Sequence, residues 1–297
     1  MKDAAVSAPH VDSWRTISDY VALTKPRLNV LVVATSAAGY YLGATTPVAA
    51  TSFIASVAGT ALVAGGAAAL NQVYERDTDA LMKRTRMRPL PNGRVTSSEA
   101  RVFGGVLSVA GLALLAAFST WLAAGLALAT LVIYLCIYTP LKRVSPVATV
   151  IGAVPGALPP LIGWTASHGS IALGGLALFL IVFLWQIPHF MAIAWLYRDD
   201  YGAAGFPMLP VIDPEGGRAG RQAVGYAAAL LPTSLVPTIV GLSGTIYGSV
   251  AAVLGVALLV LSVRFANART NAAARQLFFA SLVYLPLIWI VMIADKR

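Results

Sequence analysis

The sequence predicts an all-α polytopic membrane protein with about nine transmembrane helices. Three observations support this fold class. Of the 297 residues, 58% are hydrophobic and only 11% are charged, and the mean hydropathy is +0.76. Soluble domains are about one quarter charged and could not bury this much apolar surface. The apolar residues also fall into segments of roughly 20 residues, the length that a helix needs to cross a bilayer.

Short polar breaks separate the expected spans. The nine spans cover residues 28–46, 50–70, 102–119, 121–138, 147–166, 171–195, 223–242, 247–263 and 277–294. The tail before them, residues 1–24, has no long apolar core and does not read as a cleaved secretory signal, so we expect it to stay in the cytosol. Residues 25–297 then form a single transmembrane domain.

The charges orient these helices. With a cytosolic N-terminus, all but two of the 21 Lys and Arg residues fall in cytosolic segments, and the exceptions are Lys296 and Arg297. This is the positive-inside pattern. Eleven of the 12 acidic residues fall in the same segments, although carboxylates contribute little to orientation. We therefore expect the active site at the cytosolic face.

Composition also excludes other classes of protein. The formal charge of +9 suggests nucleic-acid binding, but no basic stretch is interleaved with exposed aromatic residues as in a stacking platform. We expect no nucleic-acid partner. The single cysteine, Cys136, allows neither an intrachain disulfide nor a cysteine metal cluster.

The most informative stretch follows the second span. Asn71, Glu75 and Asp79 are spaced by four residues in a segment without Gly or Pro, so the helix can continue through them. At 3.6 residues per turn, these oxygen-bearing side chains share one helix face. Oxygen ligands suit Mg²⁺, which typically binds through one or two carboxylates plus the phosphates of a substrate. The row therefore indicates a magnesium site.

A basic run comes directly after this row. Residues 83–88 contain four cations: Lys83, Arg84, Arg86 and Arg88. Such a run can anchor a loop to lipid headgroups, but Arg and Lys also hold phosphate oxygens. Beside the oxygen row, the run predicts a magnesium–diphosphate site.

Further charged residues stand on the same predicted face. Asp199 and Asp200 follow the sixth span, and because neighbours on a helix point about 100° apart, we expect one of them to face the first cluster. Lys25, Arg27 and Lys142 flank other spans, where they either anchor helix ends or share in phosphate binding. His189 lies inside an apolar helix, where an ionisable side chain usually faces the bundle interior or a cavity; a packing role is the alternative.

These motifs resemble the UbiA-type intramembrane prenyltransferases. The superfamily's first signature is an Asn followed by acidic residues four and eight positions later, which Asn71, Glu75 and Asp79 match, with Glu for the commoner Asp in the middle. The superfamily's second motif spaces two Asp by four, whereas Asp199 and Asp200 are adjacent, so the oxygen that binds a second metal ion stays open. Longer blocks are similar to the heme-directed branch of the superfamily, at residues 74–77, 82–86, 88–89, 185–190, 200–201 and 204–210. Two further blocks, at residues 24–27 and 138–143, extend the resemblance. The resemblance runs from about residue 20 to the end.

The resemblance implies transfer of a farnesyl group from farnesyl diphosphate to a vinyl group of heme b, with addition of water and release of diphosphate. Asn71, Glu75, Asp79 and Asp200 would be catalytic, and these four with Asp199 would bind Mg²⁺. His189 would orient heme, and Tyr138 and Tyr201 belong to the matching blocks. The residues expected to bind diphosphate are Lys25, Arg27, Lys83, Arg84, Arg88, Lys142 and Arg198.

The resemblance also implies a place in the cell and leaves alternatives. We expect a multi-pass protein of a bacterial inner membrane, with possible contacts to a downstream heme-modifying enzyme or a terminal oxidase. Prenylation of an aromatic quinone precursor needs the same diphosphate chemistry and differs only in the acceptor. A membrane transporter is the alternative from another class, but no ionisable row lies near the middle of the predicted spans.

Overall fold

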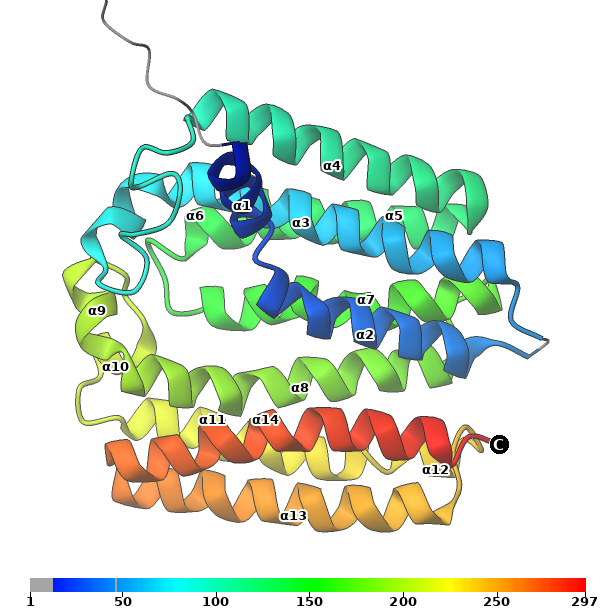
Figure 1. The fold of residues 1–297 in the computed structure, drawn as a ribbon. Coiled ribbons are helices and arrows are strands. Elements are labelled where there is room, and N and C mark those ends of the chain that lie inside the picture. The colour runs from blue at the N-terminus through cyan, green and yellow to red at the C-terminus, as the bar shows by residue number, and fades with distance from the viewer. Residues whose placement is uncertain (1–12, 46) are drawn as a thin grey trace, which may run out of the picture.

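Long helices running back and forth through one bundle make up the structure, a computed structural model that describes residues 13–45 and 47–297 (Figure 1). Within those residues there is no strand, in agreement with the predicted all-α class. The first twelve residues of the predicted tail lie outside the described part. The helices are α1 (Ser13–Leu23), α2 (Pro26–Gly43), α3 (Ala50–Leu81), α4 (Ser97–Phe118), α5 (Trp121–Val132), η1 (Ile133–Tyr138), α6 (Thr139–Leu141), α7 (Ala148–His168), α8 (Leu173–Leu196), α9 (Arg198–Ala203), α10 (Leu209–Ile212), α11 (Gly217–Thr233), α12 (Val236–Ile239), α13 (Thr245–Ala268) and α14 (Asn271–Ala294).

In the described part of the chain, seven helical segments are long and apolar enough to cross a membrane. They are α3, α4, the continuous stretch Trp121–Leu141, α7, α8, α13 and α14. The two other predicted spans are also helical. They correspond to α2, with 18 residues, and to α11, with 17 residues, followed by α12. The protein is therefore a multi-pass helical membrane protein.

Helix α3 is longer than its predicted span. It has 32 residues and continues through the whole acidic row to Leu81, as the lack of Gly and Pro there predicts. It packs closely on α4 because glycines line the contact. A Cβ added to Gly111 would lie 2.6 Å from the Gly59 carbonyl oxygen, and one added to Gly66 would lie 2.6 Å from the Gly104 carbonyl oxygen. Small residues let helix backbones approach in this way.

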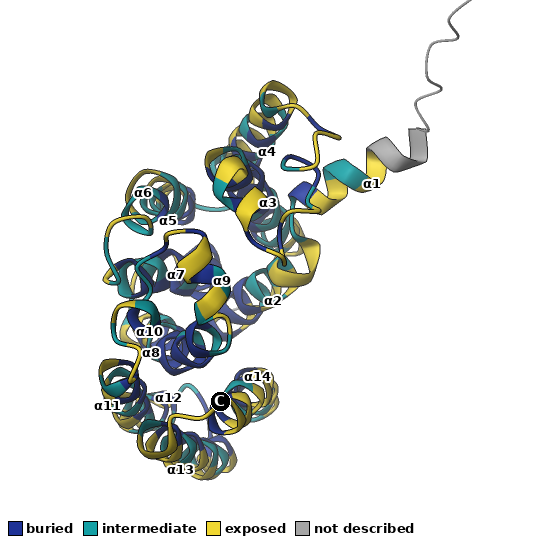
Figure 2. Ribbon diagram, turned by 90° about the vertical axis from the view of Figure 1, so that its left-hand side faces the viewer, coloured by how far each residue is buried: buried dark blue, intermediate teal, exposed yellow. Residues whose placement is uncertain are grey.

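The acidic row and the segments that surround it gather at one end of the bundle. The end of α3, α6, α9 and α10 lie on the left in Figure 1, and the start of α2 lies nearer the middle; Figure 2 looks at the bundle from the left-hand side. The chain between α5 and α6 is a six-residue π-helix, η1. π-helical turns of this kind are rare and often occur at functional sites.

Lys296, one of the two cations outside the predicted cytosolic segments, has a structural role at the opposite end of the bundle. Lys296 Nζ donates hydrogen bonds to the carbonyl oxygens of Tyr41, at 2.6 Å, and Ala44, at 2.8 Å. These carbonyls lie at the C-terminal end of α2, where a cation complements the helix dipole. Lys296 thus links the last segment of the chain to α2.

Candidate active site

The three oxygen-bearing residues of the row lie on one buried face of α3. Asn71 is 2% exposed, Glu75 4% and Asp79 1%. Asp77, on the same stretch of helix, has a side chain that is 83% exposed. The predicted shared face is therefore confirmed, and it points into the protein.

Each residue of the row has one cation as its partner. Lys25 Nζ donates to Asn71 Oδ1 at 3.2 Å, and Lys142 Nζ donates to Glu75 Oε1 at 3.1 Å. Arg88 Nη1 donates to Asp79 Oδ2 at 2.6 Å. Lys25 comes from the turn before α2, Lys142 follows α6, and Arg88 belongs to the loop after α3. Buried charges are usually paired in this way, because an unpaired one is costly.

The two lysines differ in their electrostatic setting. Burial, with the nearby Arg88 guanidinium, lowers the pKa of Lys25 to about 8. Burial also opposes the charge on Lys142, but Tyr138 and the Glu75 carboxylate outweigh it and raise the pKa of Lys142 above its ordinary value. Lys142 therefore stays protonated at neutral pH. An anion bound beside Lys25 would stabilise the protonated form of Lys25.

One oxygen of the row is left without a partner. Asp79 Oδ1 is buried and accepts no hydrogen bond, although a buried carboxylate oxygen normally has a partner. No group of three or more His, Cys, Asp or Glu side chains in the described residues could hold a metal ion alone. A divalent cation here would need oxygens from a bound ligand or water, which is the usual arrangement for Mg²⁺. The donor set fits Mg²⁺ on these grounds.

Three buried polar residues support the row and were not predicted. Thr139 is 0% exposed, and its Oγ1 accepts a hydrogen bond from Asn71 Nδ2 at 3.1 Å. Gln72 Nε2 donates to the Leu23 carbonyl oxygen at 2.7 Å, which fixes the segment before Lys25. Thr85 Oγ1 donates to the carbonyl oxygen of Asp79 at 2.8 Å. Thr139 and Thr85 lie inside the sequence blocks that resemble the family, and Gln72 is next to Asn71. Their position close to these motifs is the one sequence feature that could have identified them as site residues.

The segment with the second acidic pair packs against the end of α3. In α9, Asp199 is exposed and Asp200 is half-buried. Tyr201 and Phe206 pack with Met82, the residue that follows α3. Lys142 Nζ lies 4.5 Å from the centre of the Phe206 ring. The acidic pair therefore lies in a segment that contacts both α3 and Lys142, and Asp200 is the more sheltered of the two.

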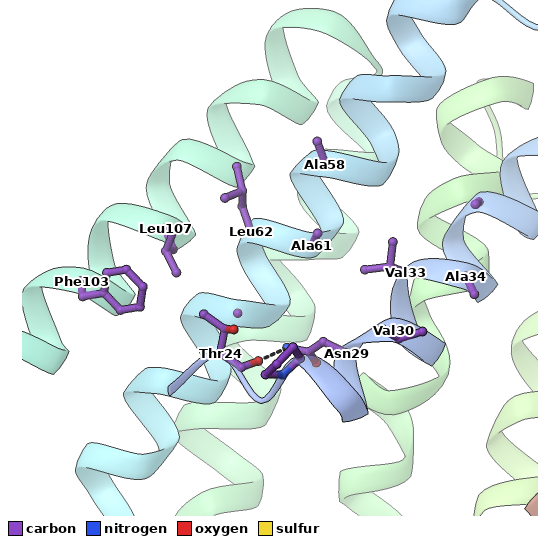
Figure 3. Close-up of a pocket in the computed structure, with 13 residues that line it drawn as sticks. Thr24, Asn29, Val30, Val33, Ala34, Ala58, Ala61, Leu62, Phe103 and Leu107 are labelled. Carbon is purple, nitrogen blue, oxygen red and sulfur yellow. Dashed lines mark hydrogen bonds between the residues drawn. The ribbon is translucent and has the colours of Figure 1, made fainter. Parts of the chain in front are cut away.

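An apolar groove opens between α2, α3 and α4 (Figure 3). It has a volume of about 670 Å³, and residues such as Val33, Ala61 and Leu107 line its walls. Its polar end is formed by Thr24 and Asn29, where Asn29 Nδ2 donates to the Thr24 carbonyl oxygen at 2.6 Å. The groove thus begins beside the turn that carries Lys25.

Comparison with known proteins decides the family. Residues 32–283 match the model of the UbiA prenyltransferase family. The chain belongs to the UbiA prenyltransferase family. It is 43% identical to the protoheme IX farnesyltransferase of Koribacter versatilis, over 98% of this chain and 97% of that protein. It is 49% identical to the protoheme IX farnesyltransferase of Opitutus terrae, over 94% and 95% of the two chains.

Solved structures share the fold. A chain from a structural study of digeranylgeranylglyceryl phosphate synthase superposes with a TM-score of 0.81, at 16% identity, covering 95% of this chain and 98% of that one. A UbiA homolog from Archaeoglobus fulgidus bound to GPP and Mg²⁺ gives a TM-score of 0.67 at 19% identity, over 93% and 99% of the chains. The predicted family and its helical fold are confirmed.

Within this UbiA protein, some predicted site residues meet and others do not. Lys25, Arg88 and Lys142 contact the row, as described above. Arg198 Nη1 instead donates to the Trp195 carbonyl oxygen and to Asn271 Oδ1. Of the remaining predicted cations, Arg84 lies over the Tyr197 ring, and Arg27 and Lys83 are exposed.

His189, predicted to orient heme, and the two tyrosines of the matching blocks lie in different surroundings. His189 is 8% exposed and lies between α8 and α14, where its Nδ1 is 2.8 Å from Ser281 Oγ. Its ring stacks on the Trp185 ring, with the centroids 4.9 Å apart. Tyr138 stacks on Tyr134 just before Thr139, and Tyr201 packs on Phe206. The two tyrosines thus lie near the acidic row, whereas His189 lies at the contact between α8 and α14.

Proposed function

We propose that this chain transfers the farnesyl group of farnesyl diphosphate to a vinyl group of heme b, adding water and releasing diphosphate to give heme o. The relatives named above support this reaction and this acceptor. The observation in the structure that carries the proposal is the buried oxygen row with a separate cation on each member. Such a site suits a diphosphate and its counterion. The heme o would supply terminal oxidases, and direct contact with an oxidase or a downstream heme-modifying enzyme is part of the proposal.

Asn71, Glu75 and Asp79 would hold Mg²⁺, with Asp200 or Asp199 on the other side. The unpartnered, buried Asp79 Oδ1 supports this assignment. When bound, Mg²⁺ would supply positive charge that stabilises the leaving diphosphate.

The cations of the chain would act on the same leaving group. Lys25, Arg88 and Lys142 would donate hydrogen bonds to diphosphate oxygens as the bond between farnesyl C1 and oxygen breaks and its electron pair leaves with diphosphate. The terminal vinyl carbon of heme b then forms a bond to C1. Water adds to the remaining carbocation and loses a proton, which completes the hydroxyethylfarnesyl group. The other predicted cations would attract farnesyl diphosphate to the site: Arg27, Lys83, Arg84 and Arg198.

The apolar chain and the heme need space outside the row. The groove of about 670 Å³ is within the range of about 300 to 1,000 Å³ that is typical of ligand sites, and we assign the farnesyl chain to it. Apolar walls would shield the allylic cation from stray water. His189 would orient heme, since imidazole is a common axial ligand of heme iron.

We further propose that all nine predicted segments span the membrane and that the row faces the cytosol, in a bacterial inner membrane. Residues 1–24 would form the cytosolic tail and residues 25–297 the prenyltransferase domain. The distribution of Lys and Arg along the sequence supports this orientation.

The test uses the purified full chain in detergent with heme b, farnesyl diphosphate and Mg²⁺, and resolves the hemes by chromatography and mass. We expect a heme heavier by one farnesyl group and one hydroxyl group, formed only with Mg²⁺. If heme is unchanged while a phenolic quinone precursor is prenylated, the acceptor assignment is wrong and the diphosphate site stands. If neither acceptor reacts and diphosphate is not released, the proposed function is wrong.

A further inference from the structure

A chain of hydrogen bonds fixes the orientation of the Asn71 amide. Lys25 Nζ donates to Asn71 Oδ1 at 3.2 Å, Asn71 Nδ2 donates to Thr139 Oγ1 at 3.1 Å, and Thr139 Oγ1 donates to the Tyr134 carbonyl oxygen at 2.7 Å. An ammonium group has no acceptor, so the amide oxygen must face Lys25 and the amide nitrogen must face Thr139. The Thr139 hydroxyl then accepts from the amide, and its own hydrogen goes to Tyr134. The direction of each hydrogen bond in this chain is thereby assigned.

The π-helix η1 makes the last of these bonds possible. The Tyr134 carbonyl oxygen accepts from the backbone nitrogen of Thr139, five residues later, and from its hydroxyl as well. A π turn adds one residue to the helix turn, so the residues after it are rotated by about 100° relative to a continuous α-helix. Pro140 follows at once and has no N–H to restore the α-helical pattern. The turn therefore sets the direction in which Thr139 and Lys142 leave the helix.

We propose that Thr139 is the positioning residue that holds Asn71 with its oxygen toward the diphosphate and metal site. This inference rests on the proposed function and adds to it the reason that the amide can serve as a ligand. The oxygen is the only atom of the amide that can bind a cation, and an amide turned over would present its nitrogen instead. Thr139 acts through Asn71 and need not touch either substrate.

Thr165 provides a buried threonine for comparison. Thr165 is also 0% exposed, but its Oγ1 donates to carbonyls of its own helix, Leu161 and Ile162. The Thr139 hydroxyl bonds a side chain of another helix, 68 residues away in the sequence. A packing role alone would not need that bond.

The experiment measures metal binding without heme. Purified wild type, Thr139→Val, Thr139→Ser and the burial-matched control Thr165→Val are titrated with Mg²⁺ at fixed farnesyl diphosphate, and the rise in unfolding temperature gives the apparent Mg²⁺ affinity. We expect Thr139→Val to weaken this affinity about tenfold, because Asn71 loses the acceptor that orients it. Thr139→Ser keeps the hydroxyl and should bind as the wild type does.

Three other results would count against the inference or move its test to another variant. If Thr139→Val binds Mg²⁺ as tightly as Thr165→Val does, Thr139 does not position Asn71, while the proposed function stands. If Thr139→Val does not fold, Thr139→Ala carries the same test, and failure of both means that the residue is structural. If farnesyl diphosphate and Mg²⁺ do not stabilise even the wild type, the proposed function fails and the inference falls with it.

Discussion

Two aspartates on α3 have opposite surroundings. The Asp79 side chain is 1% exposed and paired with Arg88, whereas the Asp77 side chain is 83% exposed and paired with Arg76. Asp79→Asn keeps the size and removes the charge that faces the proposed metal, so we expect turnover of farnesyl diphosphate to fall about 100-fold or more. Asp77→Asn should leave turnover nearly unchanged. Similar rates for the two variants, measured as farnesylated heme, would remove Asp79 from the site.

His189 tests the heme assignment separately from the diphosphate site. Its Nδ1 pairs with Ser281, and its ring lies between aromatic neighbours on α8 and α14. If His189 orients heme, His189→Ala lowers heme affinity, seen by titration of heme absorbance, without changing the binding of farnesyl diphosphate. Unchanged heme affinity and turnover in this variant would assign His189 to helix packing instead.

At the scale of helices, the contact between α3 and α4 depends on close backbone approach. A Cβ on Gly111 would lie 2.6 Å from the Gly59 carbonyl oxygen and 2.9 Å from the Val63 nitrogen, whereas a Cβ on Gly105 would meet nothing within 4 Å. Gly111→Ala should therefore destabilise the protein by about 1–3 kcal/mol through overpacking. Gly105→Ala on the same helix should have little effect. Thermal unfolding in detergent compares the two, and equal unfolding temperatures would contradict the close contact.

The groove between α2, α3 and α4 gives a second prediction at this scale. Ala61 lines the groove, and a tryptophan there would fill space assigned to the farnesyl chain. We expect Ala61→Trp to raise the KM for farnesyl diphosphate about tenfold, the effect of losing roughly 1.4 kcal/mol of binding. Val109→Trp on α4 is the control, since Val109 is 68% exposed and lies outside the groove lining. A KM within twofold of the wild type would mean that the farnesyl chain lies elsewhere.

For the whole molecule, the helices and the shared face of the acidic row could be predicted from the sequence. The contacts between residues far apart in the sequence could not. Apolar runs indicated the helices, and the spacing of four put Asn71, Glu75 and Asp79 on one face. The partner of Glu75, however, is Lys142, 67 residues away, and no local pattern carries such a pairing. The π turn before Thr139 was also not predicted, because it depends on how one helix meets another. The bond of Lys296 to the end of α2 likewise follows from the closed bundle.

The number of spans and their orientation can be tested on the whole molecule. The two segments in question are α2 and the pair α11–α12, which are short or more polar than the other seven. In a Cys136→Ser background, single cysteines replace Ser18 and Ala49 on either side of α2, and Glu215 and Val240 on either side of α11–α12. These four positions are exposed, so a membrane-impermeant thiol reagent can reach them from the side on which they lie.

If all nine segments span and the row faces the cytosol, intact bacterial cells should be labelled at positions 49 and 240 alone, because the positive-inside charge distribution assigns the other two to the cytosol. Positions 18 and 215 should react only after permeabilisation. Equal labelling of 18 and 49, or of 215 and 240, would show that the segment between them does not cross. Labelling of 18 and 215 from outside would invert the orientation and turn the acidic row away from the cytosol.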